Sequence, residues 1–434
     1  MQTRFAEDRL ARDPLVRQAN DILRTCVHCG FCTATCPTFV LLGDELDSPR
    51  GRIYLLKDML ERDKPASASV VKHIDRCLTC LSCVTTCPSG VDYMHLLDQG
   101  RAHIERTYKR PWGERLVRGM LAAVVPHTGR FRLAMLAGWL TTPVARWMPG
   151  RLGALAGMAT RRPALRAPTD RARVIPAQGP TRMRVALMRN CVQPALDPEI
   201  DAAAIRLLTR HGCEVVLADG QGCCGAVVQH MGREEAARAF ARANVRAWTT
   251  PPGETPVDRV VITVSGCGTT VKDYGHMLAG EPDIAEDAQA ISAKTVDVTE
   301  LLVELGLRDP VTETGLTVAY HAACSLQHGQ QVKTAPKTLL EGAGFHVVVP
   351  QEPHLCCGSA GTYSITQPGL SKQLRTRKLG NLGALDADVI AAGNIGCLNH
   401  LREGEGTPQA PMVHTVQLLD WATGGPRPRG LESQ

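Results

Sequence analysis

The sequence has few aromatic residues and no long hydrophobic segment. Phe, Trp and Tyr make up 4% of the 434 residues, so aliphatic side chains must fill the core. The longest uncharged apolar run, residues 133–145, contains Gly, Thr and Pro and is shorter than the ~20 residues that a membrane-spanning helix needs. The first 18 residues carry charges throughout and no apolar signal core. We therefore expect no membrane span and a cytoplasmic, reducing location, with peripheral attachment to the inner face of the cytoplasmic membrane as an open alternative.

The motifs of several enzyme classes are also missing. No P-loop, G-x-S-x-G or H-E-x-x-H occurs in the chain. Residues 220–225, GQGCCG, formally match the dinucleotide motif G-x-G-x-x-G after a predicted strand. The corresponding residues 352–358, EPHLCCG, keep both cysteines but lose two of the three glycines. We therefore predict no dinucleotide site, and neither flavin nor NAD on this chain.

Cysteine, in contrast, is abundant. Of 17 cysteines, eight form two runs near the N-terminus, residues 26–37 (CVHCGFCTATCP) and 77–88 (CLTCLSCVTTCP). Both read C-x2-C-x2-C-x3-C-P, the spacing with which two-cluster ferredoxins hold a pair of [4Fe–4S] clusters, the fourth cysteine of each run serving the other cluster. The first predicted set is Cys26, Cys29, Cys32 and Cys87, and the second set is Cys77, Cys80, Cys83 and Cys36. Zinc bound by C-x2-C pairs is the alternative.

The net charge of +6 does not call for a nucleic-acid partner. Two [4Fe–4S] clusters with four thiolates each carry roughly −2 apiece, which would leave about +2 (6 − 2 × 2). The surplus arginine is better explained by anionic clusters or an anionic partner surface. Arg50 and Arg52 stand at the start of a helix predicted over 47–64. They fit either electrostatic support of a cluster or a solvated helix start.

The C-terminal half contains an internal repeat. Residues 184–191 (RVALMRNC) match residues 317–324 (TVAYHAAC), and the CCG at 223–225 matches that at 356–358, both at a shift of 133 residues. Later in each unit an apolar strand ends in Gly-Cys, at Cys267 and Cys397. A duplicated pattern of this kind predicts two domains of the same fold.

The fold of each repeat follows from its alternating segments. Helices predicted over 197–211 and 332–343 are followed by Val-rich strands over 214–218 and 346–349. Apolar strands that alternate with helices indicate parallel α/β domains, whose sites lie at strand ends.

Eight repeat cysteines hold matched positions: Cys191, Cys223, Cys224, Cys267, Cys324, Cys356, Cys357 and Cys397. Two adjacent thiols on one tight turn, with Gly allowing close approach, suit a further metal centre between the two domains. The alternative is buried structural cysteine, which packs as a small hydrophobe. Cys213 has no counterpart and is assigned to the core.

Four histidines are close in sequence to these cysteines: His230, His321, His328 and His354. Each is a candidate ligand, a candidate proton relay to a quinone, or a polar residue with its hydrogen bonds satisfied. His321 and His354 are the better candidates because both adjoin cysteines of the second repeat.

Together these patterns predict an α+β multidomain protein. An α-helical ferredoxin-like two-cluster module over residues 1–110 is followed by a helical segment and linker over 111–180, with the linker itself at 161–180. Two repeated α/β cysteine-rich (CCG) domains follow over 181–300 and 315–424. The helical segment carries Trp112, Trp139 and Trp147. It fits contact with a partner, with a membrane surface, or with the chain's own domains.

This architecture resembles, over nearly the whole chain, the iron–sulfur subunits of bacterial glycolate oxidases. Beyond the two runs, the most specific stretches are residues 47–54 (DSPRGRIY), 324–330 (CSLQHGQ), 354–363 (HLCCGSAGTY) and 394–397 (NIGC). The CCG units also look like those of heterodisulfide reductases, lactate-utilisation proteins and the small subunit of anaerobic glycerol-3-phosphate dehydrogenase, which define the alternative function. Such units generally end in C-x-x-C, whereas these end in GCG and GCL, which argues against a heterodisulfide-type non-cubane cluster.

The resemblance implies a subunit of an oxidoreductase complex that is inactive alone and holds no catalytic residue. Flavin-containing glycolate oxidase subunits would oxidise glycolate or D-lactate, and this chain would pass the electrons to a quinone or another membrane acceptor. The residues agree with that division, because the chain has one-electron relays and no site that accepts a hydride.

Overall fold

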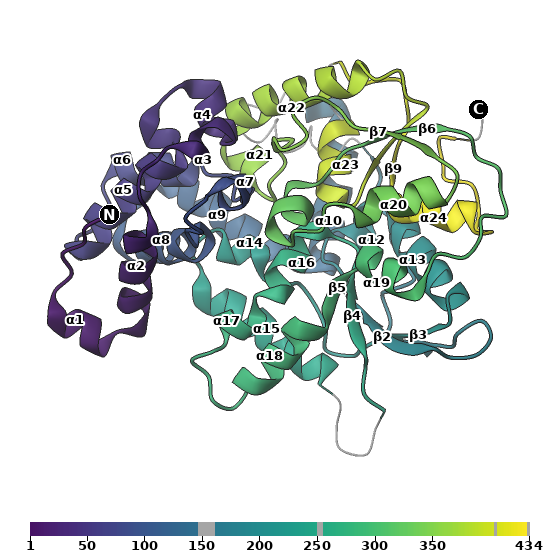
Figure 1. The fold of residues 1–434 in the computed structure, drawn as a ribbon, viewed down its shortest axis with the longest axis horizontal. Coiled ribbons are helices and arrows are strands. Elements are labelled where there is room, and N and C mark those ends of the chain that lie inside the picture. The colour runs from purple at the N-terminus through teal and green to yellow at the C-terminus, as the bar shows by residue number, and fades with distance from the viewer. Residues whose placement is uncertain (146–160, 250–254, 403–405, 432–434) are drawn as a thin grey trace.

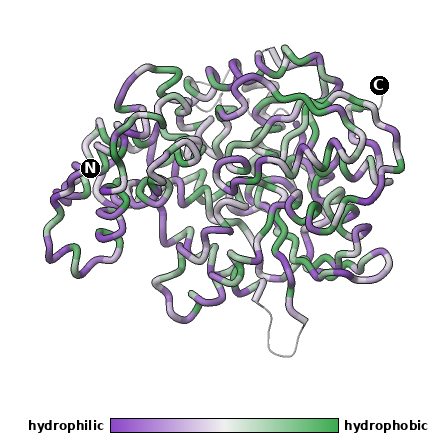
Figure 2. Tube along the Cα trace, viewed as in Figure 1, coloured by the Kyte–Doolittle hydropathy of each residue, from purple (hydrophilic) through white to green (hydrophobic). Residues whose placement is uncertain are grey.

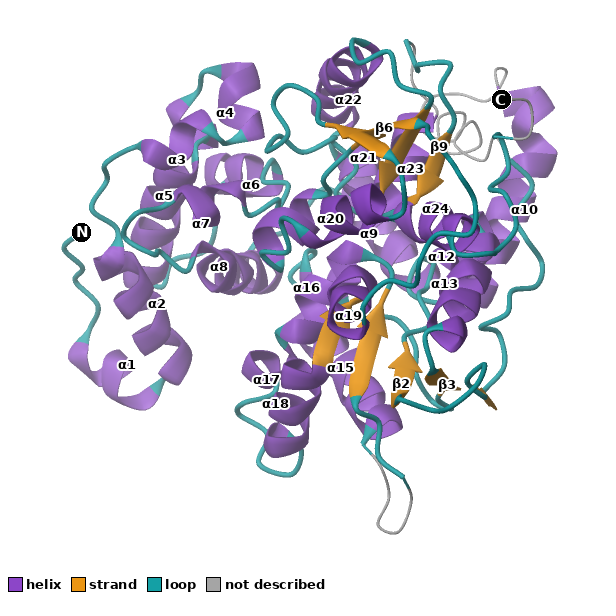
Figure 3. Cartoon of the chain, turned by 45° about the vertical axis from the view of Figure 1, so that its right-hand side comes forward, coloured by secondary structure: helices purple, strands orange, loops and turns teal. Residues whose placement is uncertain are grey.

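The computed structural model describes residues 1–145, 161–249, 255–402 and 406–431 (Figure 1). Helices of the first hundred residues form a module at one side of the molecule, and two β-sheets form the rest. The sheets lie one above the other in Figure 3, each with helices around it. The α+β fold predicted from the sequence is thereby confirmed, with a helical module followed by two repeated sheet domains.

The N-terminal module is built from short helices around the two cysteine runs. They are α1 (Glu7–Arg12), α2 (Pro14–Thr25), α3 (Phe31–Ala34), α4 (Pro37–Leu42), the 3-10 turn η1 (Glu45–Asp47), α5 (Pro49–Glu61), α6 (Ala68–Asp75), α7 (Ser82–Thr86) and α8 (Tyr93–Thr107). The helix predicted over 47–64 is confirmed as α5, which is capped by Ser48, whose Oγ accepts from the Gly51 N–H at 2.9 Å, and which has Pro49 in its first turn. Leu56 and Leu97 are fully buried in the module core, each stabilising it by roughly 1.5–3 kcal/mol.

Residues 1–25 contain two helices, α1 and α2. Asp13 interrupts them, because its carboxylate accepts from the N–H groups of Leu15 and Val16 and caps α2, with Pro14 at the first position. The chain here is largely hydrophilic (Figure 2), and only the Ala19, Ile22 and Leu23 face of α2 is buried.

The segment after the module contains α9 (Trp112–Val124) and α10 (Thr128–Ala145). Residues 146–160, with Trp147, lie outside the described residues. The linker predicted over 161–180 contains an unforeseen strand, β1 (Arg173–Ile175), which pairs antiparallel with β3 (Cys213–Leu217). The first sheet therefore begins before residue 181. In the described parts of the chain, no helix combines the length and apolarity needed to cross a bilayer.

The first repeat is a five-stranded sheet of order β1-β3-β2-β4-β5, parallel except for β1. Its further elements are β2 (Met183–Leu187), α12 (Gln193–Leu196), α13 (Pro198–Arg210), α14 (Ala226–Gln229), α15 (Glu234–Trp248), β4 (Arg259–Ile262), α16 (Ser265–Lys272), α17 (Tyr274–Met277), α18 (Ala285–Lys294), β5 (Thr295–Asp297) and α19 (Val298–Leu305). The predicted strand–helix–strand pattern is confirmed in this repeat.

The second repeat is a four-stranded parallel sheet of order β7-β6-β8-β9, the same order without the edge strand. Its elements are β6 (Thr317–Tyr320), the π-helical turn η2 (Ser325–Gly329), α20 (Ala335–Gly342), β7 (His346–Val348), α21 (Tyr363–Thr366), α22 (Pro368–Gly383), β8 (Val389–Ala392), α23 (Ile395–Arg402), β9 (Met412–His414) and α24 (Thr415–Ala422). At the seam α16 contacts η2, where the hydroxyls of Ser265 and Ser325 are 2.7 Å apart.

Candidate metal centres

The two cysteine loops of the module share one backbone shape. Positive φ angles occur at His28 (56°) and Gly30 (87°) in the first loop, and at Thr79 (54°) and Leu81 (61°) in the second. This region is costly for residues other than glycine, so strain at matched positions indicates loops held in place for a function. Such turns are what consecutive C-x2-C thiols need in order to face one centre.

The first set of cysteines lines one cavity. Cys26, Cys29, Cys32 and Cys87 all border it, together with Cys83 of the second set, Arg50 and Tyr93. Cys26 stands at the C-terminus of α2 and Cys87 at the C-terminus of α7, so helix ends position both. The structure thus brings together the four residues of the crossed set, and ligation by them stays a prediction.

The second set lies deeper. Cys36, Cys80 and Cys83 are buried and Cys77 is half-buried. Burial raises the pKa of the Cys83 thiol well above its usual range, and the neighbouring thiolates of Cys80, Cys77 and Cys36 add to that rise. Crowded thiols of this kind ionise readily only beside positive charge, which iron ions supply. The donor set therefore fits an iron–sulfur cluster.

A buried arginine adds positive charge at the second set. Arg52 is 1% exposed, with Nη1 3.7 Å from Cys36 Sγ and Nε donating to the His73 carbonyl at 2.7 Å. Burial opposes its charge, but nearby anions, Cys77 foremost, outweigh burial and raise the pKa of Arg52. Arg52 is therefore no solvated helix start, and its guanidinium lies between Cys36 Sγ and the fully buried Asp47 carboxylate, with Nη2 3.4 Å from Asp47 Oδ1. Arg50 is partly exposed and borders the cavity of the first set.

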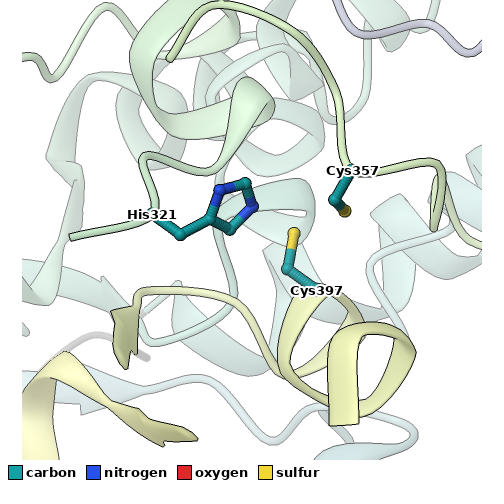
Figure 4. Close-up of side chains that lie close together, drawn as sticks. All are labelled: His321, Cys357 and Cys397. Carbon is teal, nitrogen blue, oxygen red and sulfur yellow. The ribbon is translucent and has the colours of Figure 1, made fainter. Parts of the chain in front are cut away.

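In the second repeat, four cysteines and a histidine gather at the carboxyl ends of the strands. Cys324 Sγ lies 3.7 Å from Cys356 Sγ. The ligand atoms of His321, Cys357 and Cys397 lie within 4.8 Å of one another and point toward a common centre (Figure 4). Hydrogen bonds from the thiols of Cys356 and Cys397 hold the pKa of Cys357 well below its usual range. A buried thiolate beside an imidazole is a donor set that soft metals prefer.

His321 is the least satisfied polar side chain of this group. It is 1% exposed, and neither ring nitrogen makes a hydrogen bond of good geometry in the described structure, although the imidazole faces the Cys357 thiol and helps to lower its pKa. Burying an imidazole without a partner costs roughly 1–3 kcal/mol, which a metal ligand bond would offset. His321 was predicted as one of two better histidine candidates, and its position supports that choice.

The other histidines have different surroundings. His328 bonds Thr85 Oγ1 at 2.7 Å and the His354 carbonyl at 3.2 Å, so it joins the second repeat to the module. No metal-capable group of the described residues includes the His354 ring. Burial lowers the pKa of His230 to about 3, which keeps that side chain neutral.

The cysteine group of the second repeat adjoins the second set of the module. Leu78 and Cys80 belong to one buried cluster with Cys356 and Tyr363. Tyr363 Oη donates to the Arg76 carbonyl at 3.0 Å, which fixes this contact. Burial raises the pKa of Cys80, and the next largest cause is Cys324 of the second repeat. Two thiol-rich centres are therefore in contact across the domain boundary.

The first repeat gathers its cysteines in the same way but with other neighbours. Hydrogen bonds from Cys191 and Cys224 lower the pKa of Cys223, and Cys267 is a further neighbour of Cys224. Met188, at the position of His321, is fully buried. A cavity of about 490 Å³ opens beside Cys191 and Cys223, lined also by Pro126, His127, Thr128, Gly129, Arg132, Asp170, Arg189, Gln221 and Gly222. Sequence reasoning missed this cavity.

The structure forms two thiol groups, one in each repeat, where the sequence suggested one shared centre. Each Cys-Cys-Gly turn follows a strand of its own sheet, β3 or β7, and glycine is required in both turns. Gly225 has φ 90° and Gly358 has φ 93°, and a Cβ on Gly358 would lie 2.6 Å from the Ser371 carbonyl. Cys213 is fully buried among aliphatic side chains, as predicted.

These features define an iron–sulfur protein with a dicluster module and two CCG domains. The family model described as 4Fe-4S dicluster domain matches residues 22–91, and the one described as cysteine-rich domain matches residues 185–272 and 318–402. The chain belongs to the family of glycolate oxidase iron–sulfur subunits. It is 41% identical over 423 residues to the glycolate oxidase iron-sulfur subunit of Escherichia coli K12, which covers 97% of this chain and 99% of the relative.

Other relatives agree. A probable glycolate oxidase iron-sulfur subunit of Bacillus subtilis 168 is 32% identical and covers 93% of this chain and 94% of the relative. Lactate utilization protein A of Geobacillus kaustophilus HTA426 is 30% identical over 50% of this chain and 89% of its own length. A crystal structure of a hypothetical protein from Helicobacter pylori shares the fold alone, with a TM-score of 0.52 and 10% identity over 88% of this chain and 68% of that one.

Proposed function

We propose that this chain is the electron-transfer subunit of a complex that oxidises glycolate, with D-lactate as a second candidate substrate. Flavin-containing partner subunits oxidise the substrate, and this chain passes the electrons to a quinone or another membrane acceptor. The observation that carries the proposal is the contact between the second set of cysteines and the thiol group of the second repeat, through Cys80 and Cys356. Adjacent redox centres are what a chain of one-electron transfers requires.

Within this proposal the first and second sets each hold one [4Fe–4S] cluster, and the thiol groups of both repeats hold further iron, in the second repeat with His321 beside the thiols. When bound, such clusters supply one-electron transfer. The chain's own residues hold and screen them: Arg52 compensates the second set, and the fold buries Cys36, Cys80 and Cys83 away from water.

Iron analysis of anaerobically purified full-length protein tests the cofactors. We expect about eight irons from the two runs, plus further iron from the thiol groups of the repeats. Because ligands cross between runs, Cys36→Ser should change the spectrum of the cluster held by Cys77, Cys80 and Cys83 and leave the other intact. One zinc per run would contradict this assignment.

Activity measurements test the division of labour. The isolated chain should show no glycolate dehydrogenase activity, and adding the flavin-containing subunits should start glycolate-dependent reduction of a quinone analogue. Bound flavin and turnover in the purified single chain would contradict the proposal.

The cavity of the first repeat is the proposed acceptor site. Its volume of about 490 Å³ lies within the range of small-ligand sites, roughly 300–1,000 Å³. It borders Cys191 and Cys223, and Arg189, Arg132 and His127 bring N–H donors for the two carbonyl oxygens of a quinone. The turn between α9 and α10 forms one wall of the cavity.

Peripheral attachment to the cytoplasmic face of the membrane would place this cavity near a lipid-borne quinone. Trp112 (81% exposed) and Leu116 (63%) on α9, with Leu133 (69%) and Leu140 (64%) on α10, support such attachment. Flotation of the full chain with liposomes would test it, and a chain that stays unbound to anionic and neutral vesicles alike would contradict it.

A further inference from the structure

The two cysteine loops of the module are matched in backbone but opposite in exposure. A shift of 51 residues aligns Val27 with Leu78 and Cys29 with Cys80. Val27 is 65% exposed and Leu78 is 6% exposed. Cys29 is likewise exposed, whereas Cys80 is buried. Since the loops have the same shape, their surroundings and not their conformation cause this difference.

The second repeat covers the second loop. Leu78 and Cys80 pack in one buried cluster with Tyr363, Leu370 and Leu374 of that repeat. The second loop is therefore covered by an apolar protein surface, and that surface brings another thiol-rich centre into contact with the loop.

The first loop has no such cover from the described part of its own chain. Phe31 is 65% exposed and Tyr54, on α5, is 60% exposed. The Tyr54 ring meets that of His28 edge-on, with centroids 6.3 Å apart, so α5 continues the surface of the loop. We name Val27, Phe31 and Tyr54 the apolar rim. Large apolar and aromatic side chains grouped around an exposed site are typical of the buried centre of protein interfaces.

We propose that the apolar rim is the docking surface for the flavin-bearing protein that donates electrons, seated on the first loop as the second repeat is seated on the second. This inference rests on the proposed function and adds to it the surface at which electrons enter this chain. Electrons from a reduced flavin enter one at a time at the first set, two transfers reoxidise the flavin, and its protons go to solvent. The second set is closed to such a donor because Leu78 and Cys80 are buried.

Charge substitutions in the rim test the proposal in the full-length chain mixed with its flavin-containing subunits. Val27→Glu and Phe31→Glu should each weaken the binding of those subunits by at least about tenfold, because a desolvated carboxylate would face an apolar partner. Reduction of the clusters by substrate should slow in parallel. Iron content and reduction by dithionite, a small molecule that needs no docking, should stay at the wild-type level.

Control substitutions to Glu at other exposed residues distinguish loss of docking from a general effect of the added charge. Val311→Glu, at a residue that is 73% exposed outside the module, should behave as wild type. If either loop variant loses iron, Tyr54→Glu, which lies on α5 outside the cysteine loop, gives the deciding measurement. Wild-type affinity in Tyr54→Glu and in the iron-replete loop variants would overturn the docking surface, as would loss of binding in Trp112→Glu alone. Failure of the wild-type chain to accept electrons from the flavin subunits would instead contradict the proposed function.

Discussion

The two CCG repeats share strand order and cysteine positions, but their thiols have different neighbours. The second repeat adds His321 to its thiols and packs against the second set of the module. The first repeat has the buried, apolar Met188 at the same position and borders a cavity of about 490 Å³. The two repeats therefore share one scaffold but differ in surroundings: the module covers the thiols of the second repeat, and a cavity opens beside those of the first.

The largest expected effect comes from two single variants, each lacking one thiol of one repeat. Their comparison tests directly whether the two repeats differ in role. We expect Cys357→Ser to lower iron content and to slow electron delivery to the acceptor by about 100-fold, because a lost ligand in the second repeat interrupts the relay. Cys224→Ser, its counterpart, should also lower iron content but slow delivery less. The iron content and the stopped-flow rate of acceptor reduction measure both. Equal rates for the two variants would mean that the repeats do not differ in role.

Exchanging the residues at the matched positions His321 and Met188 should change the difference in metal binding between the two repeats. His321→Ala should weaken metal binding in the second repeat by at least about 10- to 100-fold, since losing even a group that only orients a metal ligand costs that much. Met188→His should strengthen metal binding in the first repeat, and Met188→Leu, a swap of similar volume, should leave it unchanged. Metal titration of each variant, with the module spectra as internal reference, gives the answer. Unchanged metal affinity in His321→Ala would make that imidazole structural.

How much of this could be read from the sequence depends on how local each signal is. The cysteine runs and the repeat were predictable because their spacing is written in consecutive residues. The strand β1 was missed because three partly exposed residues, Arg173–Ile175, become a strand only by pairing with β3. The cavity was missed because Arg132, Asp170 and Arg189 come from three separate segments. The opposite exposure of Val27 and Leu78 is likewise set by tertiary contacts alone.

The open pocket should depend on Arg189, whose counterpart in the second repeat is Ala322. Its guanidinium donates to the Asp170 and Gln221 carbonyls at 3.1 and 2.9 Å and has no carboxylate partner among the described residues. Arg189→Gln should raise the KM for a quinone analogue by about tenfold, which is the loss of one hydrogen bond to a charged donor. Iron content should not change. Arg184→Gln, which removes an ion pair with Glu214 on the same sheet, is the control and should leave the KM as it was.

The smallest expected effect concerns the N-cap residues of α19 and α24, the helices that follow the last strand of each sheet. Asp297 caps α19 and His414 caps α24, both in capping boxes. His414 Nε2 donates to the Thr263 carbonyl of the first repeat at 2.9 Å and Nδ1 accepts from the Val416 N–H, so the fold needs the neutral ring. Burial lowers the pKa of His414 to about 4 and raises the pKa of Asp297 to about 6.

These shifts predict opposite responses to acid. For His414 the unfolded chain binds the proton first, so its contribution is complete above pH 6.5 and is lost as the pH falls toward 4, by about 2 kcal/mol between pH 7 and pH 5. For Asp297 the folded chain binds the proton first, so acidification over the same interval adds about 1 kcal/mol. His414→Gln keeps a donor and an acceptor without titrating, and Asp297→Asn keeps an uncharged cap. The unfolding free energy of each variant is compared with that of the wild type at each pH, so that acid damage to the cofactors, which is common to all three proteins, cancels. In acid, His414→Gln should become more stable relative to the wild type, and Asp297→Asn should become less stable. Unfolding free energies that shift in the same direction for both variants would contradict this opposition.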